Sequence, residues 1–367
     1  MDSAFPRGRV IAVPSHPGAE YRPPPRPATF ADAALEGLLQ MRRLPPGWLM
    51  QAALRLYLEV EHGWEVALGR LSTKPAAATP EVAERSGDLM RLHYDLPLPL
   101  FAKMLGPSMK YSMALWENGE RTLEDAQEAM LADACRKARV RDGESILDLG
   151  CGFGSLSAYL LRTFPNARVT GLTLSRTQAD YIRRARNFPG HPLNNPRFRL
   201  VQADFNAVEF SEKFDRVMSL GVFEHISNLD LALHKVRRFV NEGGGLFLHY
   251  IVYLPVREGQ HTVRQCEFIQ RHIFPGGRVY AFDELARHQQ DFALRAAWYR
   301  PGRNYRKTIE CWLQNFLRRR ALIAQAAQLS ERTLRVWEIY LRACAATFAT
   351  ARGWAFGNGQ YYLEARS

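Results

Sequence analysis

A glycine-rich loop between an expected strand and an expected helix constrains this chain more than any other feature. Gly150, Gly152 and Gly154 directly follow the apolar run Ser145–Leu149 and precede a run with helical periodicity over 156–162. Residues without a Cβ atom let the backbone N–H groups of such a loop approach a ligand closely. The sequence therefore predicts a strand–loop–helix unit that holds a nucleoside-like ligand. The alternative is that the glycines only turn the chain.

Stretches typical of strands alternate with helical stretches after this loop. The further expected strands are Arg168–Leu174, Phe198–Gln202, Asp215–Leu220 and Gly245–Tyr250. Such alternation predicts an α/β fold, with a parallel sheet covered by helices on both faces. After Tyr250 the pattern becomes mostly helical, with helices expected over 308–325 and 331–352. The last segment, 359–365, alternates as an edge strand that returns to the sheet would.

The part of the chain before this core has a different character. Residues 1–28 are rich in proline and arginine, so we expect a disordered tail. Residues 29–84 are expected to form a helical region, in which Pro45-Pro46 separates two helices and 72–80 forms a linker. The core domain is then expected over 85–367.

Composition excludes several classes of protein. With 47% hydrophobic and 23% charged residues, the chain has the balance of a globular protein. No apolar run reaches the roughly 18 to 20 residues that span a bilayer, and the N-terminus lacks the apolar core of a secretory signal. The five cysteines are scattered, which argues against disulfides and against a zinc site. We therefore expect a cytoplasmic protein without a bound metal.

The charge balance is strongly basic. A formal charge of +12 and a pI near 9.7 favour acidic partners such as a phospholipid surface. Arginine-rich chains are also often basic without a specific partner. No nucleic-acid-binding motif is present, so no nucleic-acid partner is expected.

The glycine loop does not fit a dinucleotide-binding fingerprint. That motif would place its third glycine at position 155, which is Ser155, and would need an acid roughly 20 residues further on. The second expected strand ends in the sequence 171–175, which contains no acid. The loop instead resembles the first motif of class I S-adenosylmethionine-dependent methyltransferases, which follows an aspartate.

This resemblance implies a Rossmann-like sheet with S-adenosylmethionine bound at Asp148 and the three loop glycines. Asp204 comes just after the expected strand 198–202, where such enzymes accept a hydrogen bond from the adenine amino group, with Phe205 beside it. A helix N-cap is the alternative role of Asp204.

A series of shorter motifs narrows the class to one family. They are Met109–Ser112, Thr122–Gln127, Leu147–Gly154, Gly171–Ser175 with Gln178, Phe223–His225, His249, Phe274–Gly277, and Tyr305 with Trp312. In this order they resemble the cyclopropane fatty acid synthase family, which includes mycolic acid modifying enzymes and plant benzylisoquinoline N-methyltransferases. The resemblance covers residues 95–367. It implies a helical insertion over about 252–350 that covers the substrate, and it is compatible with a homodimer.

The family also implies roles for single residues. Tyr111 and Ser112 would contact the carboxylate side of the cofactor, and Thr173 and Gln178 would hold its ribose. In the lipid-modifying members, methyl transfer to an alkene leaves a carbocation, and a bound bicarbonate removes a proton from it.

The positions that match the bicarbonate ligands are Glu224, His249, the backbone of Ile251 and Tyr305, and His225 is a further catalytic candidate. Each has a structural alternative. Glu224 and His225 could cap a helix, His249 could be a satisfied core histidine, and Tyr305 could serve packing alone.

Two departures from the family pattern bear on the methyl acceptor. The lipid-modifying members usually have a cysteine after Tyr-Ser, where this chain has Met113, which counts against bicarbonate. The plant amine methyltransferases typically have a second acid three residues before Glu-His, where this chain has Gly221, which counts against a substrate ammonium. The favoured hypothesis is methyl or methylene transfer to an unsaturated acyl chain or lipid, with peripheral contact to an anionic membrane. The alternatives are N-methylation of a small, alkaloid-like amine, and a cofactor-binding protein without catalysis.

Aromatic residues are frequent in the C-terminal part, where they could line an apolar cavity or pack as ordinary core. They are Trp298, Tyr299, Trp312, Phe316, Trp337, Tyr340, Phe348 and Trp354.

Overall fold

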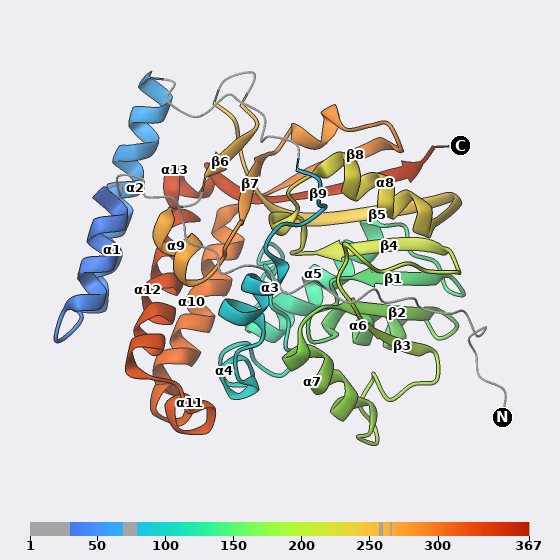
Figure 1. The fold of residues 1–367 in the computed structure, drawn as a ribbon, viewed down its shortest axis with the longest axis horizontal. Coiled ribbons are helices and arrows are strands. Elements are labelled where there is room, and N and C mark those ends of the chain that lie inside the picture. The colour runs from blue at the N-terminus through green and yellow to red at the C-terminus, as the bar shows by residue number, and fades with distance from the viewer. Residues whose placement is uncertain (1–29, 69–78, 257–259, 265, 367) are drawn as a thin grey trace.

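A mixed sheet forms the centre of the molecule (Figure 1). The computed structural model describes residues 30–68, 79–256, 260–264 and 266–366. Within these ranges the strands are β1 (Ser145–Leu149), β2 (Arg168–Thr173), β3 (Phe198–Gln202), β4 (Phe214–Leu220), β5 (Val240–Tyr253), β6 (Thr262–Arg264), β7 (Arg278–Ala281), β8 (Phe292–Pro301) and β9 (Phe356–Ala365). The parallel part has the order β3-β2-β1-β4-β5. Beyond it, β9 pairs antiparallel with β5 and β8 pairs antiparallel with β9, while β7 and β6 continue from the end of β5.

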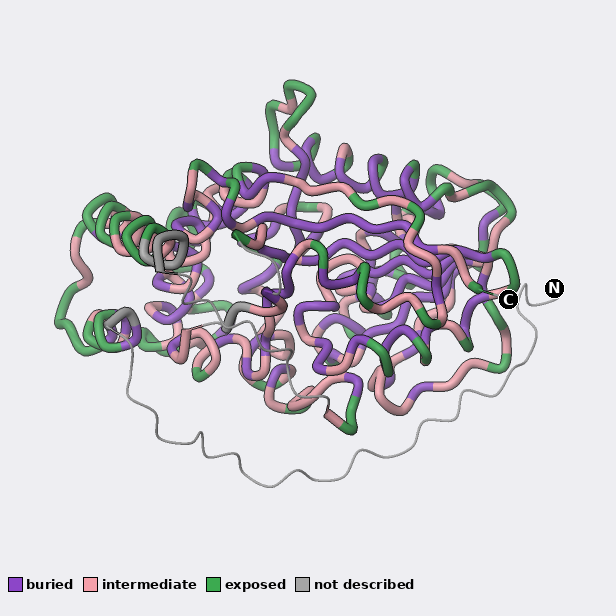
Figure 2. Tube along the Cα trace, turned by 90° about the horizontal axis from the view of Figure 1, so that it is seen from above, coloured by how far each residue is buried: buried purple, intermediate pink, exposed green. Residues whose placement is uncertain are grey.

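Helices cover both faces of this sheet. Successive side chains of a strand point to opposite faces, and apolar residues occur on both. In β1, Leu147 and Leu149 pack in one cluster with Leu233 of α8 (Leu229–Phe239). Ile146 points to the other face and packs in a second cluster with Met130 of α5 (Leu123–Lys137). The helices α6 (Ser155–Thr163) and α7 (Arg176–Arg186) contribute to this second cluster. Buried strands between helical layers are the arrangement seen from above in Figure 2.

A group of helices stands over the carboxyl ends of the parallel strands. It comprises α4 (Leu98–Met104), α10 (Gly302–Arg318), α11 (Arg320–Ala327), α12 (Glu331–Thr347) and the short α13 (Thr350–Gly353). Three short elements, α3 (Ser86–Leu89), the π-helix Met90–Tyr94 and the 3-10 helix Phe223–His225, lie at the same end of the sheet. Phe101, Trp312 and Trp337 from these helices pack in one buried cluster. This group covers one side of the strand ends (Figure 1).

The N-terminal helices form a hairpin against the outside of this group. α1 (Phe30–Gln40) and α2 (Gly47–Leu68) lie beside α12 and α9 (Glu267–His272). The Asp32 carboxylate accepts from the backbone N–H of Phe268 at 2.9 Å, which ties α1 to the start of α9. Much of the outward side of the hairpin is exposed (Figure 2). In the described part of the chain, no helix has the length and apolar character needed to cross a bilayer.

The structure confirms the expected α/β class and the five parallel strands. Four have their expected bounds to within one residue, whereas β5 extends beyond the expected 245–250 at both ends. The break at Pro45-Pro46 lies between α1 and α2, as expected. The expected tail, 1–28, and most of the expected linker, 72–80, lie outside the described residues. Val82, three residues before the expected start of the core domain, is buried in the sheet cluster. The division into domains stays a prediction.

The expectation after Tyr250 was wrong in two respects. The residues from 252 to 301 are mainly strands and short helices, since β7 and β8 precede α10. β8 has the sequence FALRAAWYRP, whose alanines, leucine and arginines favour helices. Pairing with β9 overrides that preference. The segment 359–365 belongs to β9, which is not an edge strand, because β5 and β8 flank it on both sides.

Candidate active site

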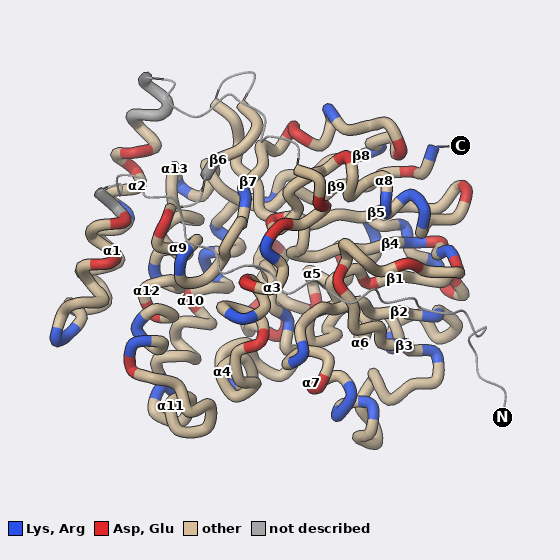
Figure 3. The backbone as a smooth tube through the Cα atoms, viewed as in Figure 1, with Lys and Arg blue, Asp and Glu red and all other residues tan. Residues whose placement is uncertain are grey.

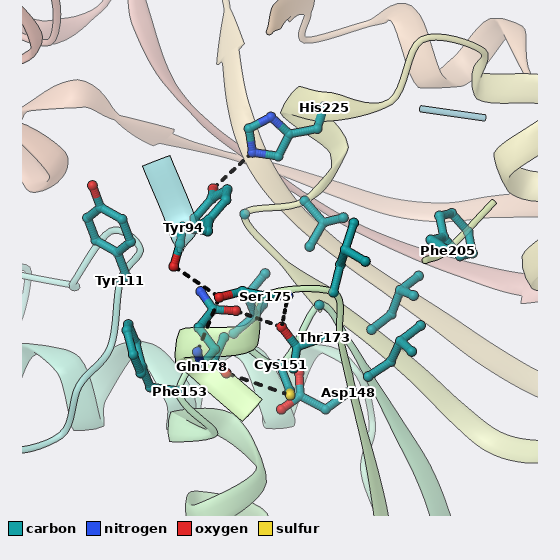
Figure 4. A pocket seen from close by; sticks show the side chains of 18 of the residues that line it. Tyr94, Tyr111, Asp148, Cys151, Phe153, Thr173, Ser175, Gln178, Phe205 and His225 are labelled. Carbon is teal, nitrogen blue, oxygen red and sulfur yellow. Dashed lines mark hydrogen bonds between the residues drawn. The ribbon is translucent and has the colours of Figure 1, made fainter. Parts of the chain in front are cut away.

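A cavity lies at the carboxyl ends of β1, β2, β3 and β4, where ligands of open parallel sheets bind. Its atom-free space is about 1070 Å³, part of it open to solvent. The cavity is lined by these predicted site residues: Tyr111, Ser112, Asp148, Gly150, Gly152, Thr173, Gln178, Asp204, Phe205 and His225. Figure 4 shows most of their side chains from close by. Their roles stay predictions, because lining a cavity does not show what fills it.

The glycine loop forms the floor of the cavity. Gly150 has φ +76°, and a Cβ atom there would lie 2.1 Å from Cγ2 of Val222. Gly152 has φ +56° and open space where its Cβ would be. Gly154, by contrast, is the N-cap of α6 and does not line the cavity. The loop therefore presents bare backbone to the cavity at Gly152, as close contact with a ligand requires.

Asp148 fixes the loop to the helix that follows. One of its carboxylate oxygens accepts from the backbone N–H of Ser157 at 3.1 Å and from its hydroxyl at 2.7 Å. Burial raises the pKa of Asp148 to about 7. The aspartate thus anchors α6 while its other oxygen remains for the cavity that it lines.

A chain of hydrogen bonds holds the wall formed by the end of β2 and the start of α7. The Thr173 hydroxyl donates to the side-chain oxygen of Gln178 at 2.7 Å, and the Ser175 hydroxyl caps α7 at Gln178. The Gln178 side chain is thereby held in place, with its amide hydrogens able to donate to a ligand. The Ser175 hydroxyl also donates to the carbonyl of Tyr94 at 2.9 Å, which brings the π-helix onto this wall.

Asp204 follows β3 on the opposite wall. Its carboxylate accepts from the backbone N–H of Asn206 at 2.8 Å, which stabilises a turn and not a helix. A carboxylate has further acceptor sites, so this bond leaves Asp204 able to accept from a ligand as well.

Glu224 and His225 follow β4 on a 3-10 helix and differ in their surroundings. One Glu224 oxygen accepts from the backbone N–H of Ile251 at 2.9 Å, while the other is buried without a hydrogen-bond partner among the described residues. Burial raises the pKa of Glu224 to about 7. The Nε2 atom of His225 lies 2.9 Å from the hydroxyl of Tyr94. Burial lowers the pKa of His225 to about 4, so its ring is neutral at pH 7.

His249 is buried and Tyr305 is half-buried, and neither is among the described residues that line the cavity. Both ring nitrogens of His249 are buried and have no hydrogen-bond partner in the described structure. Burial, with the charge of Lys110 as the next cause, lowers the pKa of His249 well below its usual value. Tyr305 on α10 contacts Phe348, with ring centres 4.5 Å apart. Burial, followed by the charge of Glu224, raises the pKa of Tyr305.

The structure therefore separates the predicted catalytic residues. His225 lines the cavity, whereas Glu224, His249 and Tyr305 are not among the described residues that line it. The predicted aromatic set is also divided. Trp312 and Trp337 pack near Tyr111, whereas Trp354 is 50% exposed and stacks on Tyr299 elsewhere.

Two residues of the site were missed by sequence reasoning. Tyr94 lies 131 positions from His225, and no local pattern marks it as a partner. Lys110 belongs to a motif that was noticed, but a lysine is normally exposed, and nothing nearby in the sequence indicates that it is buried.

The strand order, the glycine loop and the cavity over it define the fold of class I S-adenosylmethionine-dependent methyltransferases. Residues 83–353 match the family model described as mycolic acid cyclopropane synthetase. This chain belongs to that family, which confirms the expected resemblance.

Relatives of both expected kinds are similar to the chain. A probable fatty acid methyltransferase of Pseudomonas putida is 32% identical over 71% of this chain and 65% of its own length. An (S)-coclaurine N-methyltransferase of Thalictrum flavum subsp. glaucum is 30% identical over 60% of this chain and 61% of its own length. The chain thus spans less than two thirds of these curated relatives.

Solved structures share the fold over a larger part of the chain. A mycolic acid cyclopropane synthase complexed with S-adenosylhomocysteine (SAH) and CTAB has a TM-score of 0.65 at 26% identity, covering 77% of this chain and 99% of that one. A coclaurine N-methyltransferase bound to N-methylheliamine and SAH has a TM-score of 0.76 at 23% identity. The match covers 90% of this chain and 98% of that one.

Proposed function

We propose that this chain is a methyltransferase that takes its methyl group from S-adenosylmethionine and transfers it to an unsaturated acyl chain. The cofactor is supported by the bare backbone at Gly152, by the amide of Gln178, and by family members bound to SAH. Asp204 is available to the adenine amino group, and Ser112 to the cofactor carboxylate.

The observation that carries the choice of acceptor is Gly221. It lines the cavity with φ +78°, a conformation that residues with a side chain rarely adopt, and its missing Cβ would lie 3.7 Å from Cβ of Ser112. The plant amine methyltransferases that this chain resembles typically have a carboxylate at this position, which would attract a substrate ammonium group. Gly221 offers none, which favours an uncharged acceptor such as an alkene.

The residues present offer a fit to bicarbonate at three positions. The second oxygen of Glu224 and the ring nitrogens of His249 are buried polar atoms without partners among the described residues, which a small hydrogen-bonding group would satisfy. Tyr305 is close enough for the charge of Glu224 to shift its pKa. The backbone N–H of Ile251 is occupied by Glu224, and the thioether of Met113 has no hydrogen to donate, so neither adds a free donor. Glu224, His249 and Tyr305 would therefore hold the anion.

When bound, S-adenosylmethionine supplies the methyl group, and bicarbonate supplies the base that takes a proton from the resulting carbocation. The residues of the chain orient these groups and exclude water. Glu224 is fixed by Ile251 and can share a proton with an adjacent acid or base, since burial places its pKa at about 7. The aromatic rings of Tyr94, Tyr111 and Tyr305 surround this region and can stabilise a developing positive charge.

The test is incubation with S-adenosylmethionine carrying a deuterated methyl group, followed by mass spectrometry of the acceptors. Vesicles of monounsaturated phosphatidylglycerol should acquire label, while matched saturated vesicles should not. A panel of secondary amines is run in parallel. Label in the amines and none in the lipid would replace the acyl acceptor with the alternative, N-methylation. No label in either would overturn the proposed activity.

We also propose that the N-terminal hairpin contacts an anionic membrane surface. Its exposed residues include Trp48, 72% exposed, and Leu56, 67% exposed, on the outer side of α2. Arg42 and Arg43 are exposed in the loop that precedes α2, at the end of the hairpin that is blue in Figure 3. Exposed aromatic and aliphatic side chains beside arginines are the composition that binds the interface of anionic bilayers.

A further inference from the structure

Lys110 is a buried lysine next to the cofactor cavity that no role has yet explained. Its exposed fraction is 1%, and its ammonium group has three acceptors. These are the Ser112 hydroxyl at 2.7 Å, the Ser112 carbonyl at 3.3 Å and the Met113 carbonyl at 2.6 Å. In the part of the chain that the structure describes, Lys110 forms no ion pair with a carboxylate. A buried charge without a counter-charge is costly, so this arrangement needs a reason.

The hydrogen bond to Ser112 determines what that hydroxyl can do. When Lys110 is protonated its ammonium group can only donate, so the Ser112 oxygen accepts from it. The hydroxyl hydrogen of Ser112 must then point to another acceptor. Ser112 lines the cavity together with Gly150, Gly152 and Gly221, whereas Lys110 itself does not line it. The free hydrogen of Ser112 is therefore available to an acceptor inside the cavity.

We infer that Lys110 is a positioning residue that acts through Ser112 to bind the carboxylate of the cofactor's methionine part. It makes the Ser112 hydroxyl an obligatory donor, and it supplies a positive charge behind that donor. No carboxylate of the described residues pairs with Lys110, and the carboxylate of the ligand would provide that counter-charge. This inference rests on S-adenosylmethionine being the cofactor, as proposed above, and adds how its charged end is recognised.

Neighbouring groups do not offer a competing explanation. His249, which lies close enough for the charge of Lys110 to lower its pKa, carries no charge that could pair with an ammonium group. The Gln127 side chain bonds the backbone carbonyl of Lys110, not its ammonium group. Burial lowers the pKa of Lys110 to about 7, and an anion bound nearby would favour its protonated form.

The test compares two ligands that differ at the charged end. Isothermal titration calorimetry measures the affinity for SAH, which has the amino acid carboxylate, and for 5′-methylthioadenosine, which lacks it. Lys110→Met should weaken SAH binding about tenfold to a hundredfold, the range of a lost charge-assisted hydrogen bond, and leave 5′-methylthioadenosine binding unchanged. If the role of Lys110 were purely structural, Lys110→Met would weaken the binding of both ligands equally.

A matched control and a second variant make the result decisive. Lys137→Met removes another buried lysine, whose partners Asp133 and Gln360 are away from the cavity wall, and should leave the ratio of the two affinities unchanged. Ser112→Ala removes only one oxygen. It should lower the ratio of the affinity for SAH to the affinity for 5′-methylthioadenosine, as Lys110→Met does. In the Ser112→Ala background, Lys110→Met should add less than its effect alone, because it acts through Ser112.

The possible outcomes separate this inference from the cofactor proposal. A wild-type protein that binds neither ligand would overturn both. A wild-type protein that binds SAH with an affinity ratio unchanged in Ser112→Ala would overturn the role of Lys110 alone, even if Lys110→Met does not fold. Equal losses for both ligands in Lys110→Met would also overturn it.

Discussion

Gly150 offers the sharpest separation of folding from ligand binding at this site. In Gly150→Ala the new methyl group would lie 2.1 Å from Cγ2 of Val222, and φ is +76°. The left-handed conformation costs a residue with a side chain roughly 1–2 kcal/mol. Overpacking a tightly filled position adds about 1–3 kcal/mol. We therefore expect Gly150→Ala to lower the free energy of unfolding by about 2–5 kcal/mol.

Two other glycines provide matched controls. Gly190 has φ +83° with nothing within 4 Å of its Cβ position, and it is exposed and distant in sequence from the loop. Gly190→Ala should therefore show only the conformational cost, about 1–2 kcal/mol. Gly152→Ala should have the same conformational cost, since φ is +56°, and no cost from a clash, since no protein atom lies within 4 Å of its Cβ position. Its methyl group would enter the cavity, so it should weaken SAH binding out of proportion to its effect on stability.

The assay is urea denaturation of the three variants and the wild type, combined with titration of SAH. In Gly150→Ala, replacing Val222 with alanine should restore part of the lost stability, because it removes the atom that clashes. If Gly150→Ala is as stable as Gly190→Ala, the close approach of Val222 does not constrain the loop. If Gly152→Ala binds SAH like the wild type, no ligand lies over the loop and the reasoning from its bare backbone fails.

Further predictions concern the acid, the tyrosine and the hairpin. Glu224→Gln should bind SAH with unchanged affinity in calorimetry but transfer no label to lipid, since it cannot share a proton. Because the pKa of Glu224 is raised from 4.5 to about 7 in the fold, the unfolded state holds fewer protons between these values. The wild-type free energy of unfolding should therefore fall as pH rises through this window, relative to Glu224→Gln in parallel urea titrations. Tyr94→Phe removes the hydroxyl beside His225 and should lower kcat about tenfold with little change in KM for the cofactor, measured in steady-state assays. Trp48→Ala should reduce co-sedimentation with phosphatidylglycerol vesicles and leave methyl transfer to detergent-dispersed lipid unchanged; equal sedimentation of both proteins would contradict contact through the hairpin.

The parallel strands could be predicted because apolar surroundings on both faces leave a pattern in the sequence of each strand itself. β1, β2 and β4 are covered by helices on both faces, so each appears as a short apolar run next to a helical stretch. β8 could not be predicted, because its strand conformation depends on β9, which follows it by more than fifty residues. The same pairing puts β9 inside the sheet, although its own sequence is compatible with an edge.

The site shows the same limit at the level of single side chains. Local motifs identify which chemical groups gather at the strand ends, but their charge depends on partners and burial that come from the fold. Glu224 and His225 are adjacent in sequence and would, with ordinary pKa values, be an ionised acid and a histidine that titrates near neutral pH. Burial moves their pKa values in opposite directions, to about 7 and about 4, so that between these values both side chains are uncharged. The sequence identifies both residues, whereas their protonation states follow from burial that only the fold provides.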